Sequence, residues 1–431
     1  MNFLHSVQDV MDLPIMGDVL LVIIPKNFKV HHTFNGISLI FLKDLSSNET
    51  YIINCSHNDI DKTLNLRSLR TKISGKSYVY NKSLIYKYLP NAVDLQLAYW
   101  MYYNDKLLIE LTNQINIYYN WYPLKNDIND IIPIVEIVAY IKNIVSQVIF
   151  LCNENIPGLE FYNHYTKYFF QIEESKLKVD SSKFYSLFKK RTDYFLNSYN
   201  FFTATGRPSN SYNNINLAAL DKANGIRSCI LPNNDRFIEF DYEAMHVRLI
   251  ANLIRSDLPS SNIHEYFGRL YFRSPVLGEE MYEKSKNYTF RQLYGTPLKE
   301  LPEIKFFSEV ELYRKKLWED YQINGYIELP SGRRLAKENL EVEKMSKTKL
   351  FNYFIQALET EHNIILIEKI IKYLFKKDSK LVLYTYDSFL FDVLDGEMED
   401  LIKSISSILN QDHFTTRIKH GINYQEMYEF K

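Results

Sequence analysis

The sequence contains little cysteine and little glycine, and it has no excess of charge of either sign. Its 431 residues include three cysteines, Cys55, Cys152 and Cys229, which are scattered and odd in number. This argues against a disulfide scaffold and against a structural zinc site, and it suits a reducing compartment. Glycine is scarce, with 13 residues, whereas there are 34 tyrosines. We attribute this bias to the codon usage of an AT-rich genome.

Long hydrophobic runs and a targeting segment are also absent. No run of about 18 apolar residues occurs, so no membrane span is expected. The first residues, Met1–His5, lack a basic region followed by an apolar one, which argues against a secretion signal. Because 51 Lys and Arg balance 52 Asp and Glu, any nucleic-acid binding must rest on local basic patches. A cytoplasmic protein is expected.

Two acidic residues at the ends of predicted strands are the main candidates for chemistry. Residues 236–239 are typical of a strand and the apolar residues after Met245 recur with helical spacing, so Asp241 lies where a strand ends and a helix begins. Asp387 lies between two apolar β-type runs, at the tip of a predicted hairpin. Such a pair suits a two-metal site for phosphoryl transfer. A strand-end Asp can also be a helix N-cap. The residues between Asp241 and Asp387 therefore decide whether the pair is interpreted as catalytic.

The first 125 residues have a pattern of strands separated by turns. Apolar runs predict strands at 19–24, 36–42, 50–54 and 77–80. Three sequential strands, then a fourth strand and helices, favour a ribonuclease-H-like sheet. A nuclease of that kind needs clustered carboxylates. The first strand has none, and only Asp94 could lie near such a site.

Residues 126–200 are predicted to be helical. Within them, residues 181–198 combine basic and aromatic side chains. This segment is typical of an amphipathic helix with a solvated basic face, or of a contact to a phosphate backbone. The polar segment 203–216 follows. It is either a connector or a loop whose Arg207 and amides bind sugar and base edges in a minor groove.

A predicted helix between the two aspartates carries a stripe of one lysine and two aromatic residues. Lys286, Phe290 and Tyr294 are each four residues apart, so they lie on one face of a helix that ends at Gly295. The lysine could hold a triphosphate while the rings pack against sugar and base. The alternative is an ordinary amphipathic helix.

Two more segments lie between this helix and Asp387. Residues 325–334 predict a β-hairpin with Ser-Gly in its turn. A helix is predicted at 346–362, where Asn352 and Gln356 are four residues apart. These amides either reach a nucleic-acid strand or are simply exposed.

From about Asn200 to the C-terminus, the order of these motifs resembles that of the family A DNA polymerases, the family of the Klenow fragment and phage T7-type replicases. The motifs that carry the resemblance are Thr205-Gly206-Arg207, Asp241-Tyr242 with Arg248, Asn262-Ile263-His264, Lys286 with Phe290, Tyr294 and Gly295, Gly325-Tyr326 with Gly332-Arg333-Arg334, Asn352 with Gln356, Tyr386-Asp387-Ser388, and residues 418–424.

The resemblance implies a mixed α+β fold arranged as a right hand, with palm, fingers and a reduced thumb. An exonuclease-type, ribonuclease-H-like domain without its metal carboxylates would precede the hand. The implied division is a degenerate 3′–5′ exonuclease-like domain (1–125), a helical thumb-like region (126–200), the first part of the palm (201–254), the fingers (255–340) and the second part of the palm (341–431).

The implied activity is template-directed addition of dNTPs to a primer 3′-OH, without proofreading. Two Mg²⁺ ions, for which Mn²⁺ could substitute, would be held by Asp241, Asp387 and the backbone carbonyl of Tyr242. Nucleotide binding would involve Lys286, Phe290, Tyr294, His264, His246 and Arg248. Primer–template binding would involve Arg207, Asn214, Gly295, Asn352 and Gln356. The resemblance also suggests a phage- or plasmid-like origin, hence the host-cell cytoplasm, and a processivity factor or other replication proteins as partners.

Three positions depart from the family's pattern. His246 stands where the family usually has Glu beside the sugar, Tyr282 where it has an Arg on the triphosphate, and Ser388 where it has a second carboxylate. Lys284 is near position 282 but on another face of the helix. His246 leaves open a polymerase with relaxed sugar selection, similar to an RNA polymerase. Tyr282 and Ser388 leave open a non-catalytic primer–template-binding protein.

Overall fold

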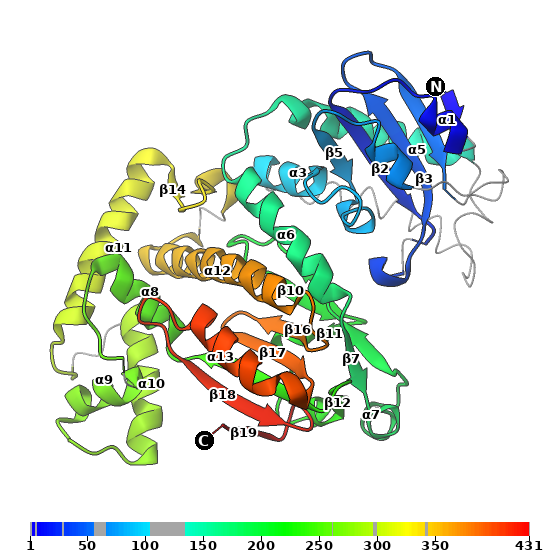
Figure 1. Cartoon of the computed structure of the whole chain (residues 1–431). Coiled ribbons are helices and arrows are strands. Elements are labelled where there is room, and N and C mark those ends of the chain that lie inside the picture. Colours follow the sequence, from blue (N-terminus) through cyan, green and yellow to red (C-terminus); the bar gives the residue numbers. More distant parts are fainter. Residues whose placement is uncertain are drawn as a thin grey trace. The chain divides into compact units, whose positions relative to one another are not determined.

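The structure is a computed structural model, and it divides into two units, Met1–Phe170 and Gln171–Lys431 (Figure 1). The residues that it describes are 2–4, 7–27, 30–55, 66–103, 134–260, 262–295, 300–340 and 344–430. The boundary falls within helix α6 (Leu159–Glu173). The five-part division given above stays a prediction.

A six-stranded sheet forms the framework of the first unit. Its strands in spatial order are β1 (Asn2–Leu4), β4 (Thr50–Asn54), β3 (Ile37–Asp44), β2 (Val19–Pro25), β5 (Ser77–Tyr80) and β6 (Val93–Asp94). Strands β2, β3 and β4 pair antiparallel, whereas β5 joins β2 and β6 joins β5 in parallel. The four strands predicted in this region are confirmed.

Strand β2 is buried along its whole length because helices cover both faces of the sheet. Leu20 and Val22 pack in one core with α3 (Leu95–Tyr103) and α5 (Ile134–Val148). The alternate residues Leu21 and Ile23 pack in a second core with Val10 of α1 (Val7–Met11) and Leu69 of α2 (Leu66–Arg70). This alternation follows from the two-residue period of a strand.

Asp94, the acidic residue singled out in this unit, begins a helix. Its Oδ1 accepts hydrogen bonds from the backbone N–H groups of Gln96 (2.9 Å) and Leu97 (3.2 Å) at the start of α3. Burial raises the pKa of Asp94, and the nearby Lys82 opposes that shift. A carboxylate that caps a helix in this way has a structural role.

The second unit is built on a five-stranded antiparallel sheet with β13 at its centre. The spatial order is β16 (Lys380–Thr385), β17 (Ser388–Val393), β13 (Arg236–Tyr242), β18 (Thr416–Gly421) and β19 (Met427–Glu429). Figure 1 shows α12 (Lys347–Leu374) and α13 (Met398–Leu409) lying along this sheet. The predicted strand before Asp241 and the hairpin around Asp387 are confirmed.

Five helices of this unit pack around one shared hydrophobic core. They are α8 (Met245–Ile254), α9 (Ile263–Phe272), α10 (Glu279–Tyr294), α11 (Lys305–Asn324) and α12. The hairpin predicted at 325–334 is confirmed as β14 (Tyr326–Glu328) and β15 (Arg334–Ala336), and Gly332 in its turn has a φ of +85°. Helix α12 begins after the N-cap Ser346 as predicted, but it continues to Leu374 because apolar residues such as Ile367 and Ile370 keep one side buried.

The prediction of one helix over residues 181–198 is wrong. Helix α7 (Ser181–Phe188) ends where Lys189 adopts a φ of +56° and its N–H bonds to the carbonyl of Tyr185. The segment then forms strands β8 (Tyr194–Leu196) and β9 (Tyr199–Asn200). Strand β8 pairs with β7 (Lys176–Val179), which pairs in turn with β12 (Ile230–Leu231). The remaining short strands, β10 (Ser209–Tyr212) and β11 (Ile215–Asn216), form a hairpin.

Among the residues that the structure describes, no helix combines the length and apolar character needed to cross a membrane.

Candidate active site

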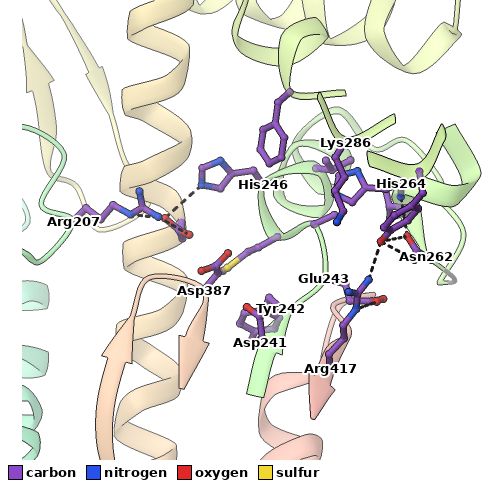
Figure 2. Close-up of a pocket in the computed structure, with 17 residues that line it drawn as sticks. Arg207, Asp241, Tyr242, Glu243, His246, Asn262, His264, Lys286, Asp387 and Arg417 are labelled. Carbon is purple, nitrogen blue, oxygen red and sulfur yellow. Dashed lines mark hydrogen bonds and ion pairs between the residues drawn. The ribbon is translucent and has the colours of Figure 1, made fainter. Parts of the chain in front are cut away.

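Strand pairing brings the two candidate aspartates together. Asp241 on β13 is the cross-strand partner of Ser388 on β17, and the N–H of Tyr242 donates to the carbonyl of Asp387 (2.9 Å). Both carboxylates line one cavity of about 380 Å³ (Figure 2). Residues far apart in the sequence therefore meet at one end of the sheet.

Tertiary contacts hold the hairpin tip that presents Asp387. Tyr386, just before it, has a φ of +62°, which is unfavourable for a residue with a bulky side chain. The Nδ2 of Asn363 on α12 donates to the carbonyl of Tyr386 (2.6 Å), and the guanidinium of Arg207 lies 3.6 Å from the centre of the Tyr386 ring. These contacts compensate for the strain and fix the direction of Asp387.

The cavity collects most of the residues predicted from the sequence, together with several that were missed. The predicted residues in its lining are Arg207, Asp241, Tyr242, His246, His264, Lys286, Phe290 and Asp387. The others with polar side chains are Asn262 and Tyr282, which were noted in the motifs, and Glu243, Glu359 and Arg417, which were missed. The sequence shows Glu359 only as a charged residue near the end of a predicted helix, which does not reveal that its side chain faces the cavity.

Arg248 and Gly295, two of the predicted site residues, lie outside the cavity lining. The guanidinium of Arg248 is buried and donates to the carbonyls of Glu243 (3.2 Å) and His413 (2.8 Å), so it holds the backbone behind the site. Gly295 is extended rather than left-handed, and a Cβ there would lie 3.0 Å from the carbonyl oxygen of Arg291. Close backbone approach therefore favours glycine at the end of α10.

The predicted amides also lie outside the cavity lining. Asn214 has a φ of +66° in the turn between β10 and β11. Gln356 donates to the Oδ1 of Asn352 (3.2 Å), so the two side chains form one amide pair on α12. The structure contains no nucleic acid, and their contact with a primer–template stays a prediction.

Glu359 is the centre of a hydrogen-bonded and ionic chain through the cavity. This carboxylate is 1% exposed, and its Oε2 lies 3.0 Å from Nε of Arg207 and 3.5 Å from Nε2 of His246. The other ring nitrogen of His246, Nδ1, is 2.9 Å from the hydroxyl of Tyr294. Tyr294 is outside the cavity lining and contacts it through His246, and a carboxylate from α12 lies beside His246.

The part of the cavity around Asp241 and Asp387 holds more negative charge than the nearby basic side chains compensate. Burial, Asp241 and Glu359 raise the pKa of Asp387 to about 6. Burial and Glu239 raise the pKa of Asp241, against the effect of Lys419, whose Nζ is 3.8 Å from Oδ2 of Asp241. Hard carboxylate oxygens with uncompensated charge are the ligands that divalent cations such as Mg²⁺ prefer.

We expect Asp387→Asn to stabilise the metal-free protein at pH 7.5. The folded-state pKa of about 6 lies above the unfolded value of about 3.9, so the ionised carboxylate opposes folding once the pH exceeds the folded pKa. Thermal unfolding without metal should give a Tm about 2–4 °C higher for the variant at pH 7.5. The gain should vanish as the pH falls from 6 to 4.

A matched aspartate just after the same hairpin separates this effect from simple removal of charge. Asp395 is exposed and forms an ion pair with Arg236, which lowers its pKa. Asp395→Asn should therefore not raise Tm at pH 7.5. A gain for Asp387→Asn that persists at pH 4 would show that the raised pKa is not its cause.

Comparisons with known proteins identify the fold. No protein-family model matches the sequence, and no curated protein matches it. Among solved structures, the chain is similar to the POL domain of Pol1 from M. smegmatis, in a complex with DNA primer-template and dNTP. The TM-score is 0.67, the match covers 97% of each chain, and sequence identity is 12%. The chain thus has a mixed α/β fold similar to that of a DNA polymerase domain.

Proposed function

We propose that this protein is a template-directed DNA polymerase that adds dNTPs to the 3′-OH of a primer. The observation that carries the proposal is the meeting of Asp241 and Asp387 in a cavity that is also lined by Lys286 and Phe290. The fold shared with a polymerase domain supports it. Primer–template DNA and dNTPs are the proposed partners.

The donor set fits divalent metal ions. Asp241, Asp387 and the backbone carbonyl of Tyr242 would hold two Mg²⁺ ions, and these would lower the pKa of the primer hydroxyl and offset charge at the α-phosphate. Asp241 lies on β13 and Asp387 in the turn just before β17, which pairs with β13, and the repulsion between the two carboxylates contributes to the raised pKa of Asp387. Mn²⁺ could substitute, because it takes the same oxygen ligands.

The other cavity residues would bind and orient the nucleotide. Lys286 supplies a positive charge for the triphosphate. The ring of Phe290 is 47% exposed and gives sugar and base a flat apolar surface. His264 contributes a hydrogen bond rather than charge, because burial, Lys286 and Arg417 lower its pKa to about 4.

We assign the sheet around β13 to the palm, helices α9 and α10 to the fingers, and the first unit to a ribonuclease-H-like domain. Three antiparallel strands followed by two parallel ones support the last assignment. The central strand β2 carries no acidic residue, and Asp94 caps a helix. Both observations favour synthesis without proofreading.

Primer extension tests the proposal and its alternatives. On a 5′-overhang DNA template with Mg²⁺, we expect extension with dNTPs, favoured over rNTPs by at least about tenfold, because one hydroxyl can be rejected to that extent or more. A strong preference for rNTPs would instead support the relaxed-sugar polymerase, which His246 motivates. Tight binding of primer–template without extension would support the non-catalytic binding protein.

A further inference from the structure

The part of the cavity around α10 has few permanent positive charges for a triphosphate. Lys286 is one, and it already lies 2.7 Å from the exposed carboxylate of Glu283. His264 is neutral at pH 7 because its pKa is lowered to about 4, chiefly by burial. Tyr282, one turn before Lys286 on the same helix, carries no charge. A nucleoside triphosphate carries several negative charges, and a further cationic side chain here would bind it through charge-assisted hydrogen bonds.

Arg417 brings a guanidinium into this part of the cavity from the sheet. It lies on β18 as the cross-strand partner of Asp241, and its side chain is 35% exposed. Its Nη2 donates to the hydroxyl of Tyr282 (3.1 Å), and its Nε donates to Glu243 (2.6 Å). Figure 2 shows Arg417 on the side of the cavity that carries His264 and Lys286, away from Arg207.

We propose that Arg417 binds the triphosphate of the incoming nucleotide and supplies from β18 the positive charge that Tyr282 does not supply from α10. The inference rests on the proposed polymerase function and adds a binding residue to that site. A guanidinium has more N–H donors than the two observed contacts use, and its planar fork matches phosphate oxygens. The hydroxyl of Tyr282 orients the guanidinium toward the cavity.

The ion pair with Glu243 can be exchanged for a phosphate. Both partners are partly exposed, 35% for Arg417 and 19% for Glu243, and such pairs stabilise a fold by little. When the arginine turns to a phosphate, Glu243 keeps a contact with the hydroxyl of Thr415 (3.4 Å). The pair thus holds the guanidinium in place until the nucleotide arrives.

Equilibrium nucleotide binding tests the proposal without requiring catalysis. The protein is bound to a primer–template whose primer ends in a 3′-dideoxynucleotide, and the Kd for the next complementary dNTP with Mg²⁺ is measured. We expect Arg417→Gln to raise that Kd about 10- to 100-fold, as for loss of a charge-assisted hydrogen bond. Arg417→Lys should restore part of the affinity. The inhibition constant of inorganic pyrophosphate in primer extension should rise in parallel for Arg417→Gln.

Two further variants separate phosphate binding from a structural ion pair. Glu243→Gln removes the same ion pair but frees the guanidinium, so the dNTP Kd should fall. Arg269→Gln breaks a comparable Arg–Glu pair, that with Glu265 on α9 outside the cavity lining, and should leave the Kd unchanged.

Three results would overturn the role of Arg417. They are an unchanged Kd in Arg417→Gln, an equal rise in Arg417→Gln and Glu243→Gln, and an equal loss of affinity for the primer–template itself. Wild-type protein that binds the dNTP but never extends a normal primer would count against the polymerase function alone, because the binding assay needs no chemistry.

Discussion

Asp387→Asn is expected to lower the rate of single-nucleotide incorporation by at least about a thousandfold. Asn keeps the shape of the side chain but removes a charged ligand for the metal ions and, with it, part of the stabilisation of charge at the α-phosphate. Asp241→Asn should have a similar effect, since both carboxylates line the same cavity. Rapid-mixing assays with a primed DNA template and Mg²⁺ measure the rate.

The two substitutions should slow the chemical step and leave primer–template binding nearly unchanged. The Kd for primer–template should change by less than about threefold, because neither aspartate carries the positive charge that binds phosphate backbones. Asp395→Asn is the matched control, an exposed aspartate just after β17, and it should keep the wild-type rate. Extension that survives in Asp387→Asn would mean that the active site lies elsewhere.

Lys286→Ala is expected to lower kcat/KM for dNTPs by about 10²- to 10³-fold, the usual cost of removing one preorganised charge from a transition state. Lys286 lines the cavity on the side of His264, which is neutral at pH 7. The loss should be almost independent of the template base, because a phosphate contact carries no sequence information. Steady-state incorporation opposite each template base provides the measurement.

Helix α10 offers an internal control for this prediction. Lys284 also pairs with a glutamate on the same helix, Glu280, but it is exposed and outside the cavity lining. Lys284→Ala should therefore keep kcat/KM within about twofold, as for a surface ion pair. Equal losses in the two variants would show that a general positive field around α10, and not a specific phosphate contact, is responsible.

The amino-acid sequence determined the local parts of the site. Alternating and helical apolar spacing placed Asp241 at the junction of β13 and α8, and Asp387 at the tip of a hairpin. The four-residue spacing of Lys286 and Phe290 placed both on one side of α10, and both line the cavity. These features follow from backbone periodicity over a few residues, so they can be predicted without knowledge of the fold.

The tertiary structure alone decided which side chains lie beside His246, Tyr282 and Ser388. Arg417 reaches Tyr282, and Glu359 lies 3.5 Å from His246. The hydroxyl of Ser388 donates to the buried Glu239 (3.1 Å). In each case, a charged side chain is placed beside the residue from another element.

These neighbours could not be predicted because they depend on long-range pairing. The register of β18 on β13 sets Arg417 opposite Asp241, and a shift of one residue would turn every side chain of β18 to the other face. In the same way, only the packing of α12 against the sheet and helices decides that Glu359 faces the cavity while Gln356 pairs with Asn352. Local periodicity specifies the elements, whereas register and packing between distant segments specify the charges that meet in the site.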